Sequence, residues 1–203
     1  MSVSGLRVPP GRAGRLWLRR RLETAQRGAE LLDRKLRILQ SESTRLRESA
    51  ARTGAEWDRC QADAGQWLLR AGLLDGQRSI RLSADDTFAE VTISYAASMG
   101  ARFPADAALA VPPPATWESP VLTTARQAHR AALAAAVRHA VAAEALRVIE
   151  AELLATRHRL RAVRDRWIPG LEHALAEVTL GIEEQERSDA ARLRLSLAGR
   201  PRD

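Results

Sequence analysis

The N-terminal part of the chain carries apolar residues at alternating steps of three and four. The series runs from Leu18 to Ala71, and Ser43 and Thr53 are its only polar members. A period of 3.5 residues kept over this length is typical of a left-handed coiled-coil seam, because it keeps one stripe facing a partner helix. No proline lies between residues 11 and 77, and Leu74-Asp75-Gly76 is a helix stop signal. The pattern therefore predicts one long helix.

A second long helix is predicted from Ser119 to Leu197. Ser119 followed by Pro120 fits an N-cap with proline at the first helical position. Residues 131–145 are mostly alanine and valine, which lets a partner helix approach closely. Steps of three and four then return and continue to residue 182. Pro169 lies inside this helix and removes one backbone hydrogen bond, so we expect a bend there.

Between the helices the apolar pattern changes to alternation. Ile80 and Leu82 flank Arg81, and apolar residues alternate with polar ones over residues 91–95. These two runs predict short strands that form a hairpin, and Pro112-Pro113-Pro114 predicts a stiff linker.

These elements together predict a mostly α fold, a long antiparallel two-helix coiled coil with a small β-hairpin in its middle segment. Leu36 and Leu39 are expected to face the second helix. Both termini would lie at one end of the coiled coil and the strands at the other. We divide the chain into helices over 11–74 and 119–197, a middle segment over 75–118 with the hairpin and the proline-rich linker, and flexible tails over 1–10 and 198–203.

Composition supports a thin core and adds an uneven charge. Apolar residues make up 45% of the 203 residues but aromatic residues only 4%, as expected where helices pack closely through alanine. The 32 basic residues exceed the 25 acidic ones, and Lys35 is the only lysine. Seven arginines face Glu23 alone in residues 1–28, whereas acidic residues dominate 75–120. A basic end and an acidic middle indicate two different partners, or helix faces in contact with solvent.

The sequence offers no catalytic, cofactor-binding or metal-binding constellation. Lys35 is not part of a phosphate-binding Gly-Lys-Ser/Thr motif, and the seam position of Cys60 favours a buried thiol. The four histidines lack a second ligand one helical turn away; they are His129, His139, His158 and His173. We expect a non-catalytic chain without cofactors.

The chain also lacks a membrane-spanning pattern. Arginines interrupt every apolar run, and the N-terminus has no apolar stretch typical of a signal peptide. We expect a cytoplasmic protein that reaches the inner face of the cell membrane only through its partners.

Three segments resemble the D-subunit family of V/A-type rotary ATPases. The N-terminal segment is similar to the family's run of Pro-x-Arg, Leu-x-Leu, Ala-x-x-Gly and Leu-Leu-x-x-Lys motifs. It comprises Pro10-Gly11-Arg12, Leu16 to Leu22, Ala25, Arg27-Gly28, Leu31-Leu32, Lys35 and Leu39. The middle one, Met99-Gly100-Ala101-Arg102-Phe103-Pro104, is similar to the family's Gly-Val-x-Val-Pro turn. The C-terminal one includes Ile168-Pro169-Gly170-Leu171 and Glu183 to Arg187. The chain differs from the family pattern at Ala101, Phe103, Arg161, Arg164, Ala190 and Ala191.

The resemblance implies a central-stalk rotor shaft, present in one copy per complex. Such a shaft couples ATP hydrolysis or synthesis in a ring of catalytic A and regulatory B subunits, A₃B₃, to rotation of a membrane ion-translocating ring. The implied contacts with A₃B₃ are Arg12, Arg15, Leu16, Arg19, Arg20, Arg21, Arg27 and Arg192. The implied contacts with the F subunit and the stalk are Ile80, Leu82, Val91, Ile93, Tyr95, Gly100 and Pro104. The C subunit would join the shaft to the membrane ring.

Two other interpretations compete with the rotor shaft. A basic coiled-coil adaptor for nucleic acid would explain the net charge and the Arg19-Arg20-Arg21 run, but the arginines are not interleaved with exposed aromatic residues and the middle is acidic. A self-associating structural coiled coil would explain the seam but leaves the strand-bearing middle unexplained.

Overall fold

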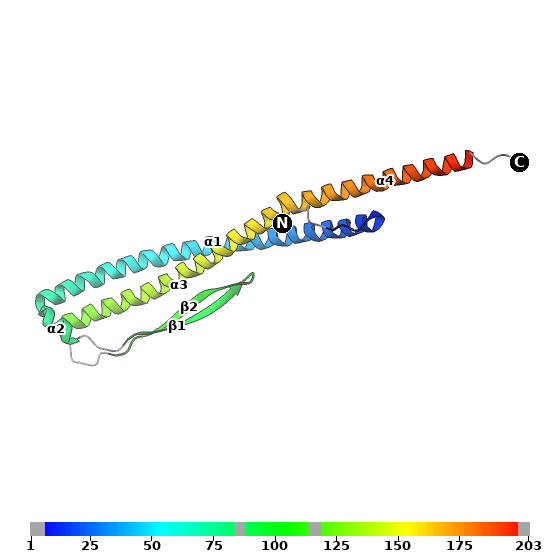
Figure 1. Cartoon of the computed structure of the whole chain (residues 1–203). Coiled ribbons are helices and arrows are strands. Elements are labelled where there is room, and N and C mark those ends of the chain that lie inside the picture. The colour runs from blue at the N-terminus through cyan, green and yellow to red at the C-terminus, as the bar shows by residue number, and fades with distance from the viewer. Residues whose placement is uncertain (1–6, 84–87, 114–118, 199–203) are drawn as a thin grey trace. The chain divides into compact units, whose positions relative to one another are not determined.

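A computed structural model describes residues 7–83, 88–113 and 119–198. The elements are helices α1 (Gly11–Leu74) and α2 (Gly76–Ser83), strands β1 (Glu90–Ser98) and β2 (Ala101–Ala110), helix α3 (Pro120–Ala162), π-helix η2 (Val163–Trp167) and helix α4 (Ile168–Ala198) (Figure 1). The mostly α fold class is confirmed. The chain divides into a terminal unit, residues 1–36 and 155–203, and a central unit, residues 37–154. The predictions for Pro114 and for residues 1–6 and 199–203 lie outside the described residues.

Glycines near both ends of α1, Gly14 and Gly76, occupy positions that favour glycine. A Cβ atom at Gly14 would lie 2.0 Å from the Pro9 carbonyl oxygen, so only glycine lets the preceding backbone cross the first turns. At the other end, Gly76 has a φ of 80°, and the Asp75 amide still donates to the Ala71 carbonyl at 2.9 Å. A left-handed glycine at this position ends a helix, which confirms the stop predicted at Leu74-Asp75-Gly76.

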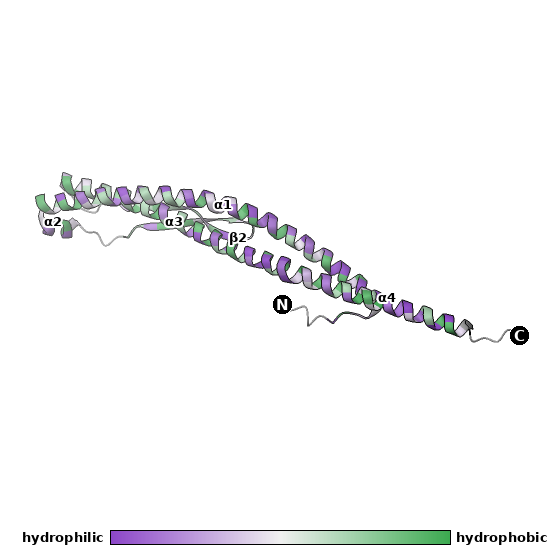
Figure 2. Ribbon diagram, turned by 90° about the horizontal axis from the view of Figure 1, so that it is seen from above, coloured by the Kyte–Doolittle hydropathy of each residue, from purple (hydrophilic) through white to green (hydrophobic). Residues whose placement is uncertain are grey.

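The predicted seam of α1 is buried or half-buried at every position from Leu18 to Ala71. Hydrophobic and hydrophilic positions alternate along the helix in Figure 2. Leu39 is fully buried and Leu36 is half-buried. The 3.5-residue period therefore identified the packed face of the helix correctly.

In the terminal unit, α1 runs antiparallel to the C-terminal helices. Arg12 pairs with Glu186 at 2.7 Å, and Asp33 pairs with Arg164 at 3.3 Å. As the chain advances along α1 from Arg12 to Asp33, the partner residue moves back from Glu186 to Arg164, as it does in an antiparallel helix pair. The buried apolar side chains of this unit are Leu18, Ala29, Leu160, Leu171 and Ile182.

The irregularity expected at Pro169 takes the form of a π turn just before it. The Ile168 amide donates to the Val163 carbonyl, five residues back, across η2. Proline lacks an amide proton and cannot continue the regular ladder, and one extra residue in the turn accommodates this defect. Trp167 closes the π turn and is half-buried.

The central unit contains a second antiparallel contact, between α1 and α3. Arg47 pairs with Glu150 at 2.5 Å, and Glu56 pairs with Arg138 at 2.8 Å. Gly54 allows close approach, since a Cβ there would lie 3.2 Å from the His139 ring. Small side chains bring the helices together and increase their van der Waals contact. Alanines fill this contact, and the buried ones are Ala64, Ala71, Ala125, Ala135, Ala142 and Ala145.

The start of α3 is capped as the sequence predicted. Ser119 precedes the helix, and its hydroxyl accepts a hydrogen bond from the Leu122 amide at 3.2 Å. The same hydroxyl donates to the Asp75 carboxylate at the end of α1. This cap therefore also joins α3 to the helix stop of α1.

The hairpin and its strand at residues 91–95 are confirmed, but the strand predicted at residues 80–82 was wrong. Residues 76–83 form α2 rather than a strand. In this short helix Ile80 lies on the face that packs against Ala71 and Leu122. The hairpin instead pairs β1 with β2, and its two-residue turn is Met99-Gly100, both with positive φ. Positive φ at both central residues matches the twist of paired strands.

The hairpin also lies along the helices of the central unit rather than beyond their end (Figure 1). Ala101 and Phe103 of β2 are buried in one cluster with Leu39, Leu46 and Ile149. Because β2 covers the helix pair, this part of the core is built from three elements, α1, α3 and β2. The hairpin therefore packs against the sides of α1 and α3 in this unit. The reason is Phe103, whose apolar ring is buried only when the hairpin folds back along α1 and α3.

Leu39→Ala should lower the free energy of unfolding by about 2–5 kcal/mol, because it leaves a cavity under Phe103. Leu31→Ala removes the same atoms from the same helix, but Leu31 is 64% exposed, so it should change stability by less than about 1 kcal/mol. Urea unfolding followed by circular dichroism measures both. Equal losses in the two variants would contradict the buried seam.

Candidate partner-binding surfaces

The predicted A₃B₃ contacts divide into arginines with and without intrachain partners. Arg12 is bound to Glu186, and Arg27 lies 4.0 Å from Glu23. Neither Arg19 nor Arg20 forms an ion pair with a described residue, and both are exposed. Fewer arginines of this stretch of α1 are therefore without an intrachain partner than the sequence indicated.

Arg21 has a different role from its neighbours. Its guanidinium carbon lies 5.0 Å from the centre of the Trp17 ring and 5.8 Å from that of Trp167. Both distances are within the range of cation–π attraction. Arg21 thus connects α1 to η2, which the sequence did not indicate.

The remaining predicted ring contacts lie on the same unit. Arg15 is half-buried, and Leu16 is 52% exposed. Arg192 of α4 is exposed and lies 3.7 Å from Asp189 of the same helix. Ion pairs as exposed as this one contribute about 0–1 kcal/mol, so a partner could displace it.

The predicted stalk contacts on the hairpin form one apolar face. Val91, Ile93 and Tyr95 alternate along β1, and each remains 43–53% exposed. The Arg102 guanidinium lies 4.5 Å from the Tyr95 ring centre and holds that ring in place. With Arg102 and Pro104, the three side chains of β1 line one side of a groove of about 370 Å³. The other side, on α3, is mostly apolar and consists of Val137, Ala140, Val141, Glu144 and Val148.

Three predicted stalk residues lie outside this groove. Ile80 is half-buried against Ala71 and Leu122, and Leu82 is exposed on α2. Gly100 is in the hairpin turn, where its φ of 84° requires glycine. The structure therefore does not bring the predicted stalk set together at one surface.

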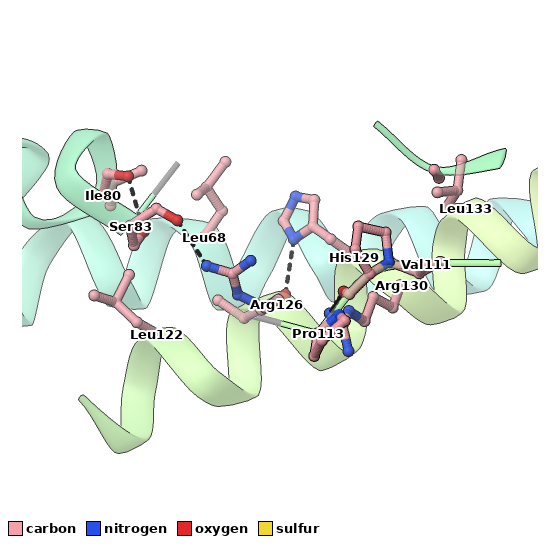
Figure 3. A pocket seen from close by; sticks show the side chains of 13 residues that line it. Leu68, Ile80, Ser83, Val111, Pro113, Leu122, Arg126, His129, Arg130 and Leu133 are labelled. Carbon is pink, nitrogen blue, oxygen red and sulfur yellow. Dashed lines mark hydrogen bonds between the residues drawn. The ribbon is translucent and has the colours of Figure 1, made fainter. Parts of the chain in front are cut away.

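Two arginines fasten the ends of the strand-bearing segment to α3. Arg126 donates to the Ser83 carbonyl at 2.7 Å, and Arg130 donates to the Pro112 carbonyl at 2.5 Å. The four-residue spacing places both arginines on the same side of α3. They bind the last residue of α2, Ser83, and a residue just after β2, Pro112. Figure 3 shows both side chains at a cavity of about 400 Å³ that Leu68, Leu122 and Leu133 also line.

In the part of the chain that the structure describes, no three His, Cys, Asp or Glu side chains are grouped so that they could hold a metal ion. The His139 ring is stacked on Trp57 at 5.6 Å and lies 3.4 Å from the Thr53 hydroxyl. His139 thus lies in the contact between α1 and α3. Cys60 is half-buried and unpaired with another cysteine.

Comparison with known proteins agrees with these observations. The family model for the D subunit of ATP synthase matches residues 16–197. A protein of Anaeromyxobacter sp. (strain Fw109-5), named as the D subunit of a V-type ATP synthase, is 29% identical over 206 residues, covering 97% of this chain and 95% of that protein.

The chain belongs to the ATP synthase D-subunit family. The family match includes both long helical regions and the hairpin. Membership accounts for the seam and for the strand-bearing middle together. A self-associating coiled coil explained only the seam, and a nucleic-acid adaptor only the basic residues.

Two carboxylates of this D-subunit family member have shifted pKa values. The hydrogen bond from Arg45 holds the pKa of Glu42 below its usual value, and Arg147 does the same for Glu144. A depressed pKa means that each ion pair stabilises the fold above the usual carboxylate pKa and loses that contribution as pH falls. Both groups stay ionised near neutral pH, and each forms an i, i+3 ion pair on the surface of its own helix.

Sequence reasoning missed the arginines that make the tertiary contacts in this D-subunit family member. For Arg126 and Arg130 the only signal was their i, i+4 spacing in a segment next to a proline-rich linker. For Arg21 the signal was its spacing of four from Trp17. The other partners, Ser83, Pro112 and Trp167, lie on different elements, so the spacing along one helix did not identify these contacts.

Proposed function

We propose that this chain is the non-catalytic central-stalk rotor shaft of a V/A-type ATPase. It couples ATP hydrolysis or synthesis in the A₃B₃ ring to rotation of the membrane ion-translocating ring. The observation that carries the proposal is the paired seam, buried or half-buried at every position from Leu18 to Ala71, in a member of the D-subunit family. The chain would be present in one copy per complex, without a cofactor of its own.

A shaft must resist twisting, and the helix pairs supply that resistance. In the central unit, buried alanines such as Ala64, Ala135 and Ala142 let the helices approach closely. Cross-helix ion pairs, Arg47–Glu150 and Arg138–Glu56, add fixed points along the pair. Close-packed interiors deform little, so torque applied at one position passes along the pair instead of bending it locally.

The proposed A₃B₃ contacts are the exposed side chains of the terminal unit. Arg19 and Arg20 have no ion-pair partner among the described residues, and Leu16 is exposed beside them. Further charge comes from Arg15, Arg27 and Arg192. Exposed ion pairs are weak, about 0–1 kcal/mol each, and weak contacts let a shaft leave one rotational position for the next.

The proposed complex places the chain on the cytoplasmic side of a membrane without crossing it. None of the helices in the described ranges is both long and apolar enough to span a bilayer. Attachment would run through the C subunit, which joins the stalk to the membrane ring.

Replacing Arg19 and Arg20 by Gln should reduce ion pumping per ATP hydrolysed by about twofold or more, because the ring loses its grip on the shaft. The isolated variant should stay folded, since neither side chain has an ion-pair partner among the described residues. ATP-driven ion uptake and ATPase rate are measured together in reconstituted vesicles.

Arg34→Gln with Arg59→Gln is the control, because it removes the same charge from exposed positions of α1 further along the helix. Unchanged pumping per ATP in the Arg19/Arg20 variant would remove these residues from the torque-bearing surface. Equal loss in both double variants would indicate a general effect of net charge.

We place the F subunit on the groove between the hairpin and α3. The apolar row of β1 faces a second row on α3, and Arg126 and Arg130 fix the ends of the segment that presents the hairpin. Exposed apolar side chains in a continuous groove are typical of a protein-binding surface. Ile80, Leu82 and Gly100, which lie outside the groove, are proposed only as stalk contacts next to it.

Ile93→Asp should weaken binding of the F subunit by about tenfold or more, because it buries a carboxylate in an apolar contact. Thr92→Asp places the same charge on the other face of the same strand and should change affinity by less than about twofold. Calorimetric titration of each variant with the purified F subunit measures the effect. Equal affinities for the two variants would move this binding site away from the groove.

A further inference from the structure

The terminal unit contains a groove that combines cationic and aromatic side chains. Its volume is about 450 Å³, and it is lined by Trp17, Arg20, Arg21, Thr24, Ala25 and Trp167. Five of these residues lie on α1 and the sixth closes η2. No acidic side chain of the described ranges lines this groove.

Two indoles contact the Arg21 guanidinium. Its carbon lies 5.0 Å from the centre of the Trp17 ring and 5.8 Å from that of Trp167. Its N–H groups form no hydrogen bond with a described residue. A planar guanidinium held in this way presents a preformed pair of donors.

Three carboxylates of the terminal unit pair with arginines outside the groove. Glu186 binds Arg12, Glu23 lies near Arg27, and Asp33 binds Arg164. The Thr24 hydroxyl donates to the Arg20 carbonyl at 2.8 Å, so its proton is used as well. The positive charge of the groove therefore lacks an intrachain counterion among the described residues.

The π turn is what brings Trp167 to this groove. The extra residue in η2 shifts side-chain positions relative to a regular helix, and π turns occur frequently at functional sites. A regular turn would direct residue 167 to a different side of the helix. The local irregularity and the cationic groove are thus parts of one arrangement.

We propose that this groove receives an Asp or Glu side chain from an acidic segment of the surrounding A₃B₃ ring. The incoming carboxylate accepts a bidentate pair of hydrogen bonds from Arg21, and Arg20 adds a second charge. Because the indoles restrict the guanidinium before binding, less side-chain entropy is lost. This inference rests on the proposed function and names the chemistry of one ring contact.

The single lysine of the chain makes a direct test possible. In a Lys35→Arg background, only the N-terminal amine can form an amide with a carboxylate through a water-soluble carbodiimide. Arg20→Lys and Arg21→Lys each add one amine in the groove, whereas Arg27→Lys and Arg34→Lys add one elsewhere on α1. Each variant is assembled with its own A₃B₃ ring, treated with carbodiimide, and analysed by mass spectrometry.

The expected result is cross-linking from positions 20 and 21 to one acidic segment of the ring, at least about fivefold above positions 27 and 34. Trp167→Leu, combined with Arg21→Lys, should reduce the cross-link because the side chain loses its support. Equal yields at all four positions, or assembly without a cross-link at 20 and 21, would overturn the groove assignment.

Other outcomes separate this inference from the proposed function. Failure of the Lys35→Arg chain to join the ring at all would contradict the rotor proposal itself. Binding of the isolated chain to mixed-sequence DNA, lost on Arg20→Gln with Arg21→Gln, would assign the groove to phosphate instead of carboxylate and overturn the inference.

Discussion

The structure depends on one constraint, that α1 keeps a single packed stripe along a helix of 64 residues. An ideal α-helix repeats every 3.6 residues, so a stripe at 3.5 stays on one side only if the helix winds around its partner. In the terminal unit the partners are η2 and α4 with the end of α3, and in the central unit the partner is α3. The helix caps and the hairpin support this stripe, and the proposed binding surfaces use side chains that lie outside it.

The polar positions of the stripe show how it tolerates exceptions. Ser43 is buried and lies within reach of the Arg47 guanidinium at 3.5 Å. Thr53 donates to the Ser49 carbonyl and faces His139, which stacks on Trp57. Each polar group is satisfied locally, so the seam continues without a buried unpaired hydroxyl at these positions.

The hairpin adds a layer where the helix pair alone would leave apolar surface uncovered. Phe103 covers the stretch around Leu39, Leu46 and Ile149. The bulge between Ser94 and Tyr95 accommodates Pro104 in the strand. One face of β2 is therefore committed to the core, and the apolar row of β1 remains available. This division lets a small element stabilise the central unit and still present a binding surface.

The sequence predicted what is periodic or local and missed what is distant or irregular. The seam, the Ser119 cap and the glycine stop follow from short-range chemistry, and each was recognised. Ile80 and Leu82 were misassigned because alternation over three residues also fits one turn of helix. Pro169 predicted an irregularity in the helix but not that it would be a π turn. The contact between Arg21 and Trp167 depends on which helix lies opposite, information that the chain's own pattern does not contain.

The central claim, that this chain turns inside a rotary ATPase, is tested most directly by observing its rotation. The chain would carry Thr92→Cys, with Cys60→Ala to remove its only native thiol, and a gold particle would be attached at position 92. The ring, with the F subunit bound to the shaft, would be fixed to a surface and supplied with ATP. Our account predicts stepwise rotation of the particle in one direction that stops when ATP is removed. A particle that fluctuates about a fixed angle while the complex hydrolyses ATP would contradict it.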